Sequence, residues 1–226
     1  MPRLYLALLI TLCGCIHSLP LFAAEVAGGP SLLLIAAEGM ADPRFRQSVV
    51  LVTRHGRGDS TLGVIVNRAL DAGLDRVFPE LTQAAEHRLH YGGPVAPGQI
   101  VFMLRGETAP ASAITLAERL FLSSDGDSLR QLLEASTPAG RLRVFTGFAS
   151  WAPRQLESEI GRGDWHLLPV DADAIFSDPP HELWLKLWRR ATQVIVQAPQ
   201  PGFPRLAALG GADYFRMRVA PILSHP

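Results

Sequence analysis

His55 and Glu157 are side chains of this sequence whose chemistry could support proton transfer. A histidine titrates near neutral pH, so His55 could act as a base or as a ligand. A carboxylate such as that of Glu157 could assist it, and a hydrolase with a cleft near Trp151 is therefore one hypothesis. The competing interpretation is structural, with His55 as a surface or capping residue beside a glycine-rich turn.

The segment WAPRQLE, residues 151–157, supplies further candidates for a ligand site. Pro153 suits the first turn of a helix, and the free N–H groups of such a turn could bind an anion. Glu157 and Glu159 oppose a second negative charge, which favours a self-capping helix start instead. A small-ligand sensor with Trp151 as an apolar wall is another option. The candidate ligand-site residues are His55, Asn67, Gly92, Gly93, Trp151, Gln155 and Glu157.

The sequence contains no complete catalytic, phosphate-binding or metal-binding motif. The segment from Gly92 to Pro94 lacks the lysine and hydroxyl of a P-loop, so it indicates a turn. His87 and His90 offer too few ligands for a metal ion. Asp125 begins a segment that starts like a calcium loop but lacks its terminal glutamate. We therefore assign no catalytic residue, no metal and no cofactor.

The hydrophobic pattern predicts short strands, with helices inserted at irregular intervals. The β-branched runs at 48–53 and 61–67 flank a glycine-rich turn, and this spacing predicts a β-hairpin with Asn67 at the end remote from His55. That separation weakens a joint catalytic role for the two residues. Further strands are predicted at 31–37, 99–104, 113–122, 141–148 and 165–170, and helices at 74–89 with a break at Pro79, 125–133, 153–160 and 181–191. This order is typical of an α+β domain.

The first 24 residues have the composition of a signal peptide. Arg3 supplies a positive charge, and the apolar run at 4–16 is shorter than a membrane-spanning helix needs. Lipidation of Cys15 is an alternative, as are an uncleaved anchor and a misassigned start codon. We expect a signal peptide at 1–24, a folded domain at 25–198 and a C-terminal tail at 199–226.

Charge and cysteine content also bear on location and partners. The formal net charge is zero, which gives no long-range attraction to nucleic acid or to an anionic membrane. Cys13 and Cys15 are the two cysteines, so the mature domain would have neither a disulfide nor a cysteine-based zinc site. We expect no nucleic-acid partner, and membrane contact only through the leader or a lipid anchor.

Two separated segments, DPRFRQSVVLVTRHGRGDSTLGVIVN at 42–67 and GFASWAPRQLESEI at 147–160, together with Gly92-Gly93-Pro94, resemble the YqgE/AlgH family of bacterial proteins. The resemblance extends from about Leu33 to Trp188. It implies one compact α+β domain with a mixed, partly barrel-like sheet and peripheral helices. It implies no settled biochemical activity, and the family's label of transcriptional regulator is genetic rather than chemical. The family usually has glycine where this chain has Arg154, so we expect a different backbone there.

The leading functional hypothesis is a non-catalytic binding or regulatory module that is exported to the periplasm and acts on a cell-envelope protein. A hydrolase or ligand sensor with a cleft around His55 and Trp151 is the first alternative. A transcriptional regulator, as the family label suggests, is the second. Direct DNA binding fits poorly, because the chain has no basic stripe and no recognisable helix-turn-helix signature.

Overall fold

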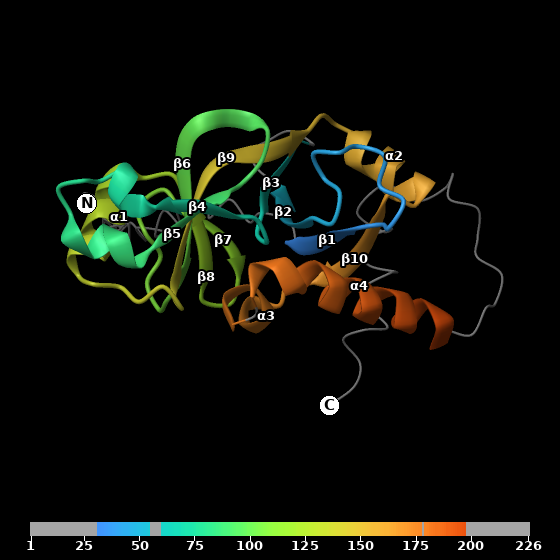
Figure 1. Ribbon diagram of the computed structural model, residues 1–226. Helices are drawn as coiled ribbons and strands as arrows, with labels where there is room; N and C mark the ends of the chain where they lie inside the picture. The colour runs from blue at the N-terminus through green and yellow to red at the C-terminus, as the bar shows by residue number, and fades with distance from the viewer. Residues whose placement is uncertain (1–30, 55–59, 178, 198–226) are drawn as a thin grey trace, which may run out of the picture.

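The centre of the fold is a curled β-sheet, seen in a computed structural model that describes residues 31–54, 60–177 and 179–197 (Figure 1). Across these ranges ten strands form one sheet. The strands are β1 (Leu32–Ala36), β2 (Val49–Arg54), β3 (Thr61–Ile65), β4 (Ala69–Gly73), β5 (Arg88–Tyr91), β6 (Val95–Arg105), β7 (Ile114–Ala117), β8 (Leu120–Ser123), β9 (Leu142–Trp151) and β10 (Trp165–Pro169).

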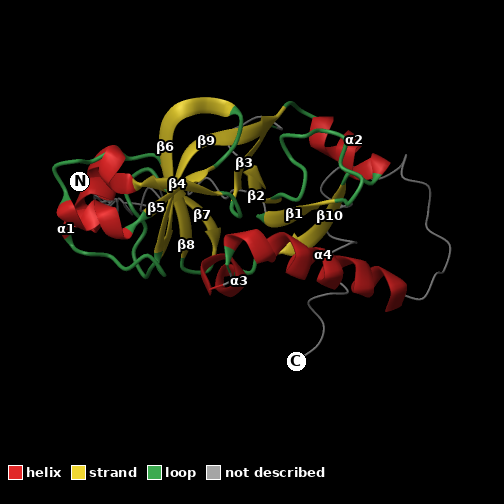
Figure 2. Ribbon diagram, in the orientation of Figure 1, coloured by secondary structure: helices red, strands yellow, loops and turns green. Residues whose placement is uncertain are grey.

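The strand order is β10-β1-β2-β3-β9-β6-β8-β7, with β5 paired to β9 and β4 paired to β5. Strands β5 and β9 are parallel, whereas neighbours such as β1 and β2 are antiparallel, so the sheet is mixed. Figure 2 shows the helices around the periphery of these strands. The predicted α+β class, with one domain and a mixed, partly barrel-like sheet, is confirmed.

The predicted hairpin forms between β2 and β3, which pair from Val50 with Ile65 to Arg54 with Thr61. Its β-branched side chains suit a pleated surface that is buried on both faces. Accordingly, Val50 and Ile65 are both fully buried. The turn at 55–59, which contains His55, lies outside the described residues.

Strand β9 changes partner along its length. Its first part pairs with β5 through Val144 to Thr146, and its last part pairs with β3 through Ala149 to Trp151. Gly147 lies between the two parts with a φ of 69°. A Cβ at Gly147 would lie 2.6 Å from the carbonyl oxygen of Gly93, so glycine permits both the bend and the close approach.

Four α-helices complete the described fold: α1 (Gly126–Glu134), α2 (Gln155–Arg162), α3 (Ala172–Ser177) and α4 (Pro180–Gln197). Helix α4 runs alongside β1 and β10 (Figure 1). Leu183, Leu187 and Ala191 form its buried face, as the spacing predicted. Trp184 Nε1 also donates to the carbonyl oxygen of Ala36 at 2.9 Å, which fixes the helix to β1.

Two predicted elements are wrong in type or number. The segment 74–89 forms no α-helix but two 3₁₀ turns, η1 (Leu74–Arg76) and η2 (Thr82–Glu86), and then enters β5. Pro79 between the turns has no N–H to donate, which prevents one continuous helix. The single strand predicted at 113–122 is a hairpin of β7 and β8, because Arg119 turns the chain with a φ of 59°.

The predicted termini remain predictions. The leader at 1–24, Cys15 within it and the tail at 199–226 all lie outside the described residues. Across the residues that the structure does describe, no helix is both long enough and apolar enough to cross a membrane.

Candidate functional site

Trp151 lies at the end of β9 in an aromatic cluster with Phe45 and Trp165. Its side chain is buried, with a residue exposure of 2%. The ring stacks on Phe45 at a centroid distance of 5.8 Å and meets Trp165 edge-on at 6.2 Å. Trp151 Nε1 donates to Glu159 Oε2 at 2.9 Å, and Trp165 Nε1 donates to the same oxygen at 3.0 Å. The polar edge of Trp151 is therefore already bonded within the protein.

Gln155 and Glu157 lie on the first turns of α2, beside this cluster. Gln155 Oε1 accepts from the backbone N–H of Ala152 at 3.2 Å, and its Nε2 donates to Glu159 Oε1 at 2.9 Å. Glu157 forms a 3.5 Å ion pair with Arg54, the residue before His55. The bond from Ala152 to Gln155 closes the helix start locally, whereas Glu157 pairs with a residue of β2 and Arg154 at the N-cap makes no side-chain cap bond.

Arg154, just before α2, has a φ of 65° and a ψ of −4°. This is the left-handed region that glycine adopts without strain and other residues avoid. We expected the backbone at Arg154 to differ from that of the glycine usual in the family. That expectation is wrong, because Arg154 itself adopts the left-handed conformation. The backbone at Arg154 is strained as a result.

Asn67, beyond the other end of β3, is buried, and both ends of its amide bond to the backbone. Its Oδ1 accepts from the N–H of Val49 at 2.8 Å, and its Nδ2 donates to the carbonyl oxygen of Gln47 at 2.9 Å. Gln47 has a φ of 53°, so Asn67 holds a strained turn in place. Asn67 and Trp151 thus lie at opposite ends of β3, since Thr61 pairs with Trp151.

Gly92 and Gly93 connect β5 to β6 where the chain passes close to β9. A Cβ on Gly92 would lie 2.2 Å from the carbonyl oxygen of Gly147, and one on Gly93 would lie 2.3 Å from the carbonyl carbon of Phe148. Only glycine fits such approaches. The candidate residues thus fall into separate groups, with Trp151, Gln155 and Glu157 together and Asn67 apart. Their assignment as a ligand site remains a prediction.

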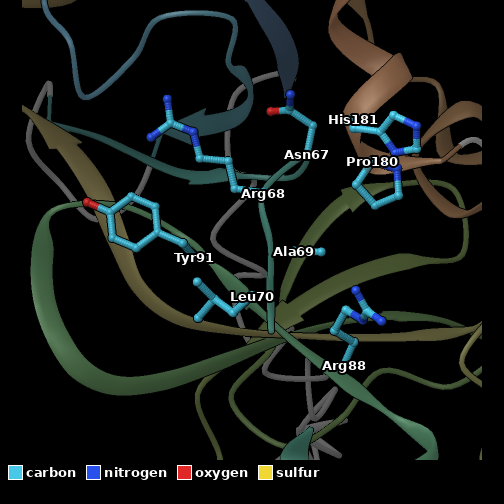
Figure 3. Close-up of a pocket in the computed structure, with 8 residues that line it drawn as sticks. All are labelled: Asn67, Arg68, Ala69, Leu70, Arg88, Tyr91, Pro180 and His181. Carbon is cyan, nitrogen blue, oxygen red and sulfur yellow. The ribbon is translucent and has the colours of Figure 1, made fainter. Parts of the chain in front are cut away.

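A pocket opens beside Asn67, between the start of β4, strand β5 and the start of α4 (Figure 3). Its volume is about 650 Å³. In Figure 3 the Arg88 side chain points toward the start of α4, and Arg68 and Tyr91 lie on the other side. No carboxylate is present among its described lining residues, so we call it the basic pocket. The lining residues are Asn67, Arg68, Ala69, Leu70, Arg88, Tyr91, Pro180 and His181.

Arg68 is the half-buried cation of the basic pocket. Its Nη2 donates to the carbonyl oxygen of Arg46 at 3.0 Å and to Ser48 Oγ at 2.9 Å. The guanidinium carbon lies 5.9 Å from the ring centre of Tyr91. Burial lowers the pKa of Arg68 below its ordinary value. These partners are neutral, so they orient the guanidinium without compensating its charge.

Arg143 and His90 lie in the interior behind the basic pocket. Arg143 is buried, donates through Nη1 to the carbonyl oxygen of Val66 at 2.9 Å and lies over the Phe176 ring at 5.5 Å. Burial lowers the pKa of Arg143 to about 10, so it stays charged at neutral pH. Burial, assisted by the charge of Arg143, lowers the pKa of His90 to about 4. His90 is therefore neutral at pH 7.

The sequence reasoning missed the basic pocket. Arg68, Arg88 and His181 are far apart along the chain, and no motif joins them. One signal was available, because Asn67 is one of the candidate ligand-site residues, and both Asn67 and the next residue, Arg68, line the pocket. Arg88 and Tyr91 join the pocket through the pairing of β4 with β5, which brings Ala69 opposite His90. Pro180 and His181 join it from the start of α4, and no local pattern encodes either placement.

Comparisons with known proteins agree on one family. The AlgH-like family model matches residues 33–195. A UPF0301 protein from Myxococcus xanthus is 38% identical over 157 residues, which are 67% of this chain and 84% of that protein. A UPF0301 protein from Methylococcus capsulatus is 36% identical over 163 residues, 70% of this chain and 88% of that protein.

Solved structures show the same fold. The solution structure of the AlgH protein from Pseudomonas aeruginosa matches with a TM-score of 0.61 and 24% identity, over 76% of this chain and 94% of that one. A crystal structure from Corynebacterium diphtheriae matches with a TM-score of 0.59 and 26% identity, over 76% of this chain and 88% of that one.

Proposed function

The chain belongs to the AlgH-like family, and we propose that it is an exported, non-catalytic module that binds a small ligand in the basic pocket. The leader, with Arg3 ahead of an apolar run, supports export. A cell-envelope protein is the partner that such a location favours. The pocket replaces the Trp151 region as the favoured ligand site, because the polar groups of that region are already bonded to one another.

The observation that carries this proposal is the composition of the basic pocket. A volume of about 650 Å³ falls within the range of small-molecule sites. Its described lining includes no serine, threonine or cysteine that could act as a nucleophile. His181 has Glu182 at 3.5 Å, but both side chains are largely exposed to solvent. Such a lining supports binding rather than covalent catalysis.

A hydrolase that uses His55 with Glu157 is the second candidate. The ion pair between Arg54 and Glu157 favours it, because the Glu157 carboxylate lies beside the strand end that leads to His55. In that case a His55→Ala variant would lose turnover of a substrate, and ligands of the basic pocket would not inhibit it. DNA binding by a regulator gains no support from a formal net charge of zero.

A thermal-shift screen of the processed protein against nucleotides, sugars and peptides tests the binding function. Leu70→Trp would fill the basic pocket, and Leu185→Trp is the matched control, because Leu185 is 40% exposed on α4 and does not line the pocket. A ligand of the pocket should stabilise the wild type and Leu185→Trp but not Leu70→Trp. Equal stabilisation of all three, or chemical conversion of the ligand, would contradict the proposal.

Mass measurement of the N-terminus from cell fractions tests export separately. A mature protein that starts near Glu25 in the periplasm is the expected result. A lipid-modified Cys15 would mean export with a membrane anchor. Recovery of the protein with an intact Met1 from the cytosol would overturn the proposed export. It would not affect the proposed binding of a ligand in the basic pocket.

A further inference from the structure

We infer that the ligand of the basic pocket is an organic anion, a carboxylate or phosphate group on a small apolar body. This inference rests on the proposed binding function and specifies the chemistry of its ligand. It depends on three observations: two arginines, Arg68 and Arg143, that have no carboxylate partner among the described residues, the placement of a helix start at the pocket, and an apolar part of the lining.

Arg68 provides the first observation. Within the described residues no carboxylate lies within 4.0 Å of its guanidinium group, although ion pairs at that limit occur elsewhere, as between Arg88 and Asp71. Its bonds to the Arg46 carbonyl and Ser48 Oγ both use Nη2. A half-buried charge without a counter-ion is costly, so an anion that reached Arg68 would recover part of that cost.

Arg143, which is buried in the interior next to the pocket, adds to the positive potential in the basic pocket. It is 8% exposed, and across the described part of the chain it too has no carboxylate within 4.0 Å. Its bond to the Val66 carbonyl places its charge next to the chain segment that enters the basic pocket at Asn67. Because buried charges are poorly screened by solvent, this field reaches farther than that of an exposed arginine.

The far side of the basic pocket is also positive. Arg88 and the first residues of α4, Pro180 and His181, line it. Helix α4 has 18 residues, and the N-terminus of a long helix carries a partial positive charge that favours anions. Two exposed carboxylates lie nearby, Asp71 at 4.0 Å from Arg88 and Glu182, in the first turn of α4, at 3.5 Å from His181. Both side chains are open to solvent, so they offset this charge only weakly.

The remaining lining explains why the ligand should have an apolar body. Ala69, Leu70, Pro180 and the Tyr91 ring line the basic pocket beside the cations. The volume of about 650 Å³ far exceeds the space of a lone inorganic anion, whereas sites of this size usually enclose small organic molecules. A ring or short carbon chain can cover these apolar groups while its anionic group meets Arg68.

Four probes separate charge from shape in an NMR titration of the full chain. Phenyl phosphate and benzoate carry the two anionic groups on a ring, inorganic phosphate has the charge alone, and benzyl alcohol has the ring alone. Phenyl phosphate, benzoate or both should shift the Tyr91 and Leu70 resonances at lower concentration than inorganic phosphate. Which of the two binds more tightly identifies the anionic group. Benzyl alcohol should leave those resonances unchanged at the same ionic strength.

Arginine variants test whether the probe binds at Arg68 and Arg88. Arg68→Gln should weaken binding of the better probe about tenfold, since a charge-assisted hydrogen bond contributes roughly one such step or more. Arg88→Gln, at an exposed position that should leave folding intact, should weaken it severalfold. Arg162→Gln is the control, because Arg162 is an exposed arginine on α2, paired with Asp164 at 2.7 Å.

Three outcomes would overturn the inference. They are equal weakening by Arg88→Gln and Arg162→Gln, shifts that benzyl alcohol reproduces, and absence of any shift with all four probes. The second outcome would leave the proposed binding function intact, because a neutral ligand would then occupy the same pocket. After the third outcome, the ligand screen with Leu70→Trp would decide whether the pocket binds anything.

Discussion

Replacement of Glu159 by alanine should destabilise the protein more than any substitution of an exposed carboxylate. Oε2 of Glu159 accepts the indole N–H groups of both Trp151 and Trp165, at 2.9 and 3.0 Å. Both tryptophans are 2% exposed, so water cannot easily replace the lost acceptor. Oε1 of the same carboxylate also accepts from Gln155, which ties the start of α2 to the cluster.

The magnitude follows from these contacts. A hydrogen bond to a charged group contributes about 1.5–3 kcal/mol, and a buried donor left without a partner costs about 1–3 kcal/mol. Loss of the two indole bonds should therefore lower the free energy of unfolding by about 3–5 kcal/mol. Glu159→Gln keeps an amide oxygen that can accept from the indoles, so it should cost about 1–2 kcal/mol.

Urea denaturation followed by far-ultraviolet circular dichroism measures this difference without relying on tryptophan emission. Glu134→Ala, at the exposed end of α1, serves as the control and should change stability by no more than about 0.5 kcal/mol. A loss below about 1 kcal/mol for Glu159→Ala would refute the reasoning. It would mean that the two indole groups find other acceptors and that the WAPRQLE segment is not held by this carboxylate.

Three other substitutions or conditions have expected outcomes. Arg154→Gly should raise stability by about 0.5–1 kcal/mol in the same assay, because relief of a φ of 65° outweighs the added freedom of the unfolded chain. The pKa of His90, lowered to about 4 from about 6.5 in the unfolded chain, should make stability fall as the pH drops from about 6.5 toward 4, since the unfolded state then binds the extra proton. The loss is on the order of 3 kcal/mol, and His90→Gln should flatten this part of the pH profile. Gly92→Ala should abolish soluble expression, because the new Cβ would lie 2.2 Å from the carbonyl oxygen of Gly147, whereas Gly98→Ala meets no atom within 4 Å and should fold.

Much of the fold could be predicted because the main strands and helices have clear local sequence patterns. The β2–β3 hairpin follows from two β-branched runs, and α4 follows from apolar residues at helical spacing. Strand β4 was missed because Ala69–Gly73 is short and none of its residues is fully buried. It exists through its pairing with β5, which no local pattern encodes.

The basic pocket was harder to predict because its chemistry depends on Arg68 having no carboxylate partner among the residues that the structure describes. The sequence shows Arg68 as one of many arginines, and only the fold shows that its neighbours are carbonyl, hydroxyl and aromatic groups. For Trp151 the opposite holds. Its motif suggested a ligand wall, but Phe45 and Trp165, contributed by distant segments, cover its ring.

The change of pairing partner along β9 has a consequence for the unfolding of the sheet. One strand pairs with β3 on one side and with β5 and β6 on the other, so loss of β9 would remove a pairing partner from both sides of the sheet. Once β9 leaves, both sides lose their common edge together. We therefore expect the two sides of the sheet to unfold together, because both depend on this ten-residue strand.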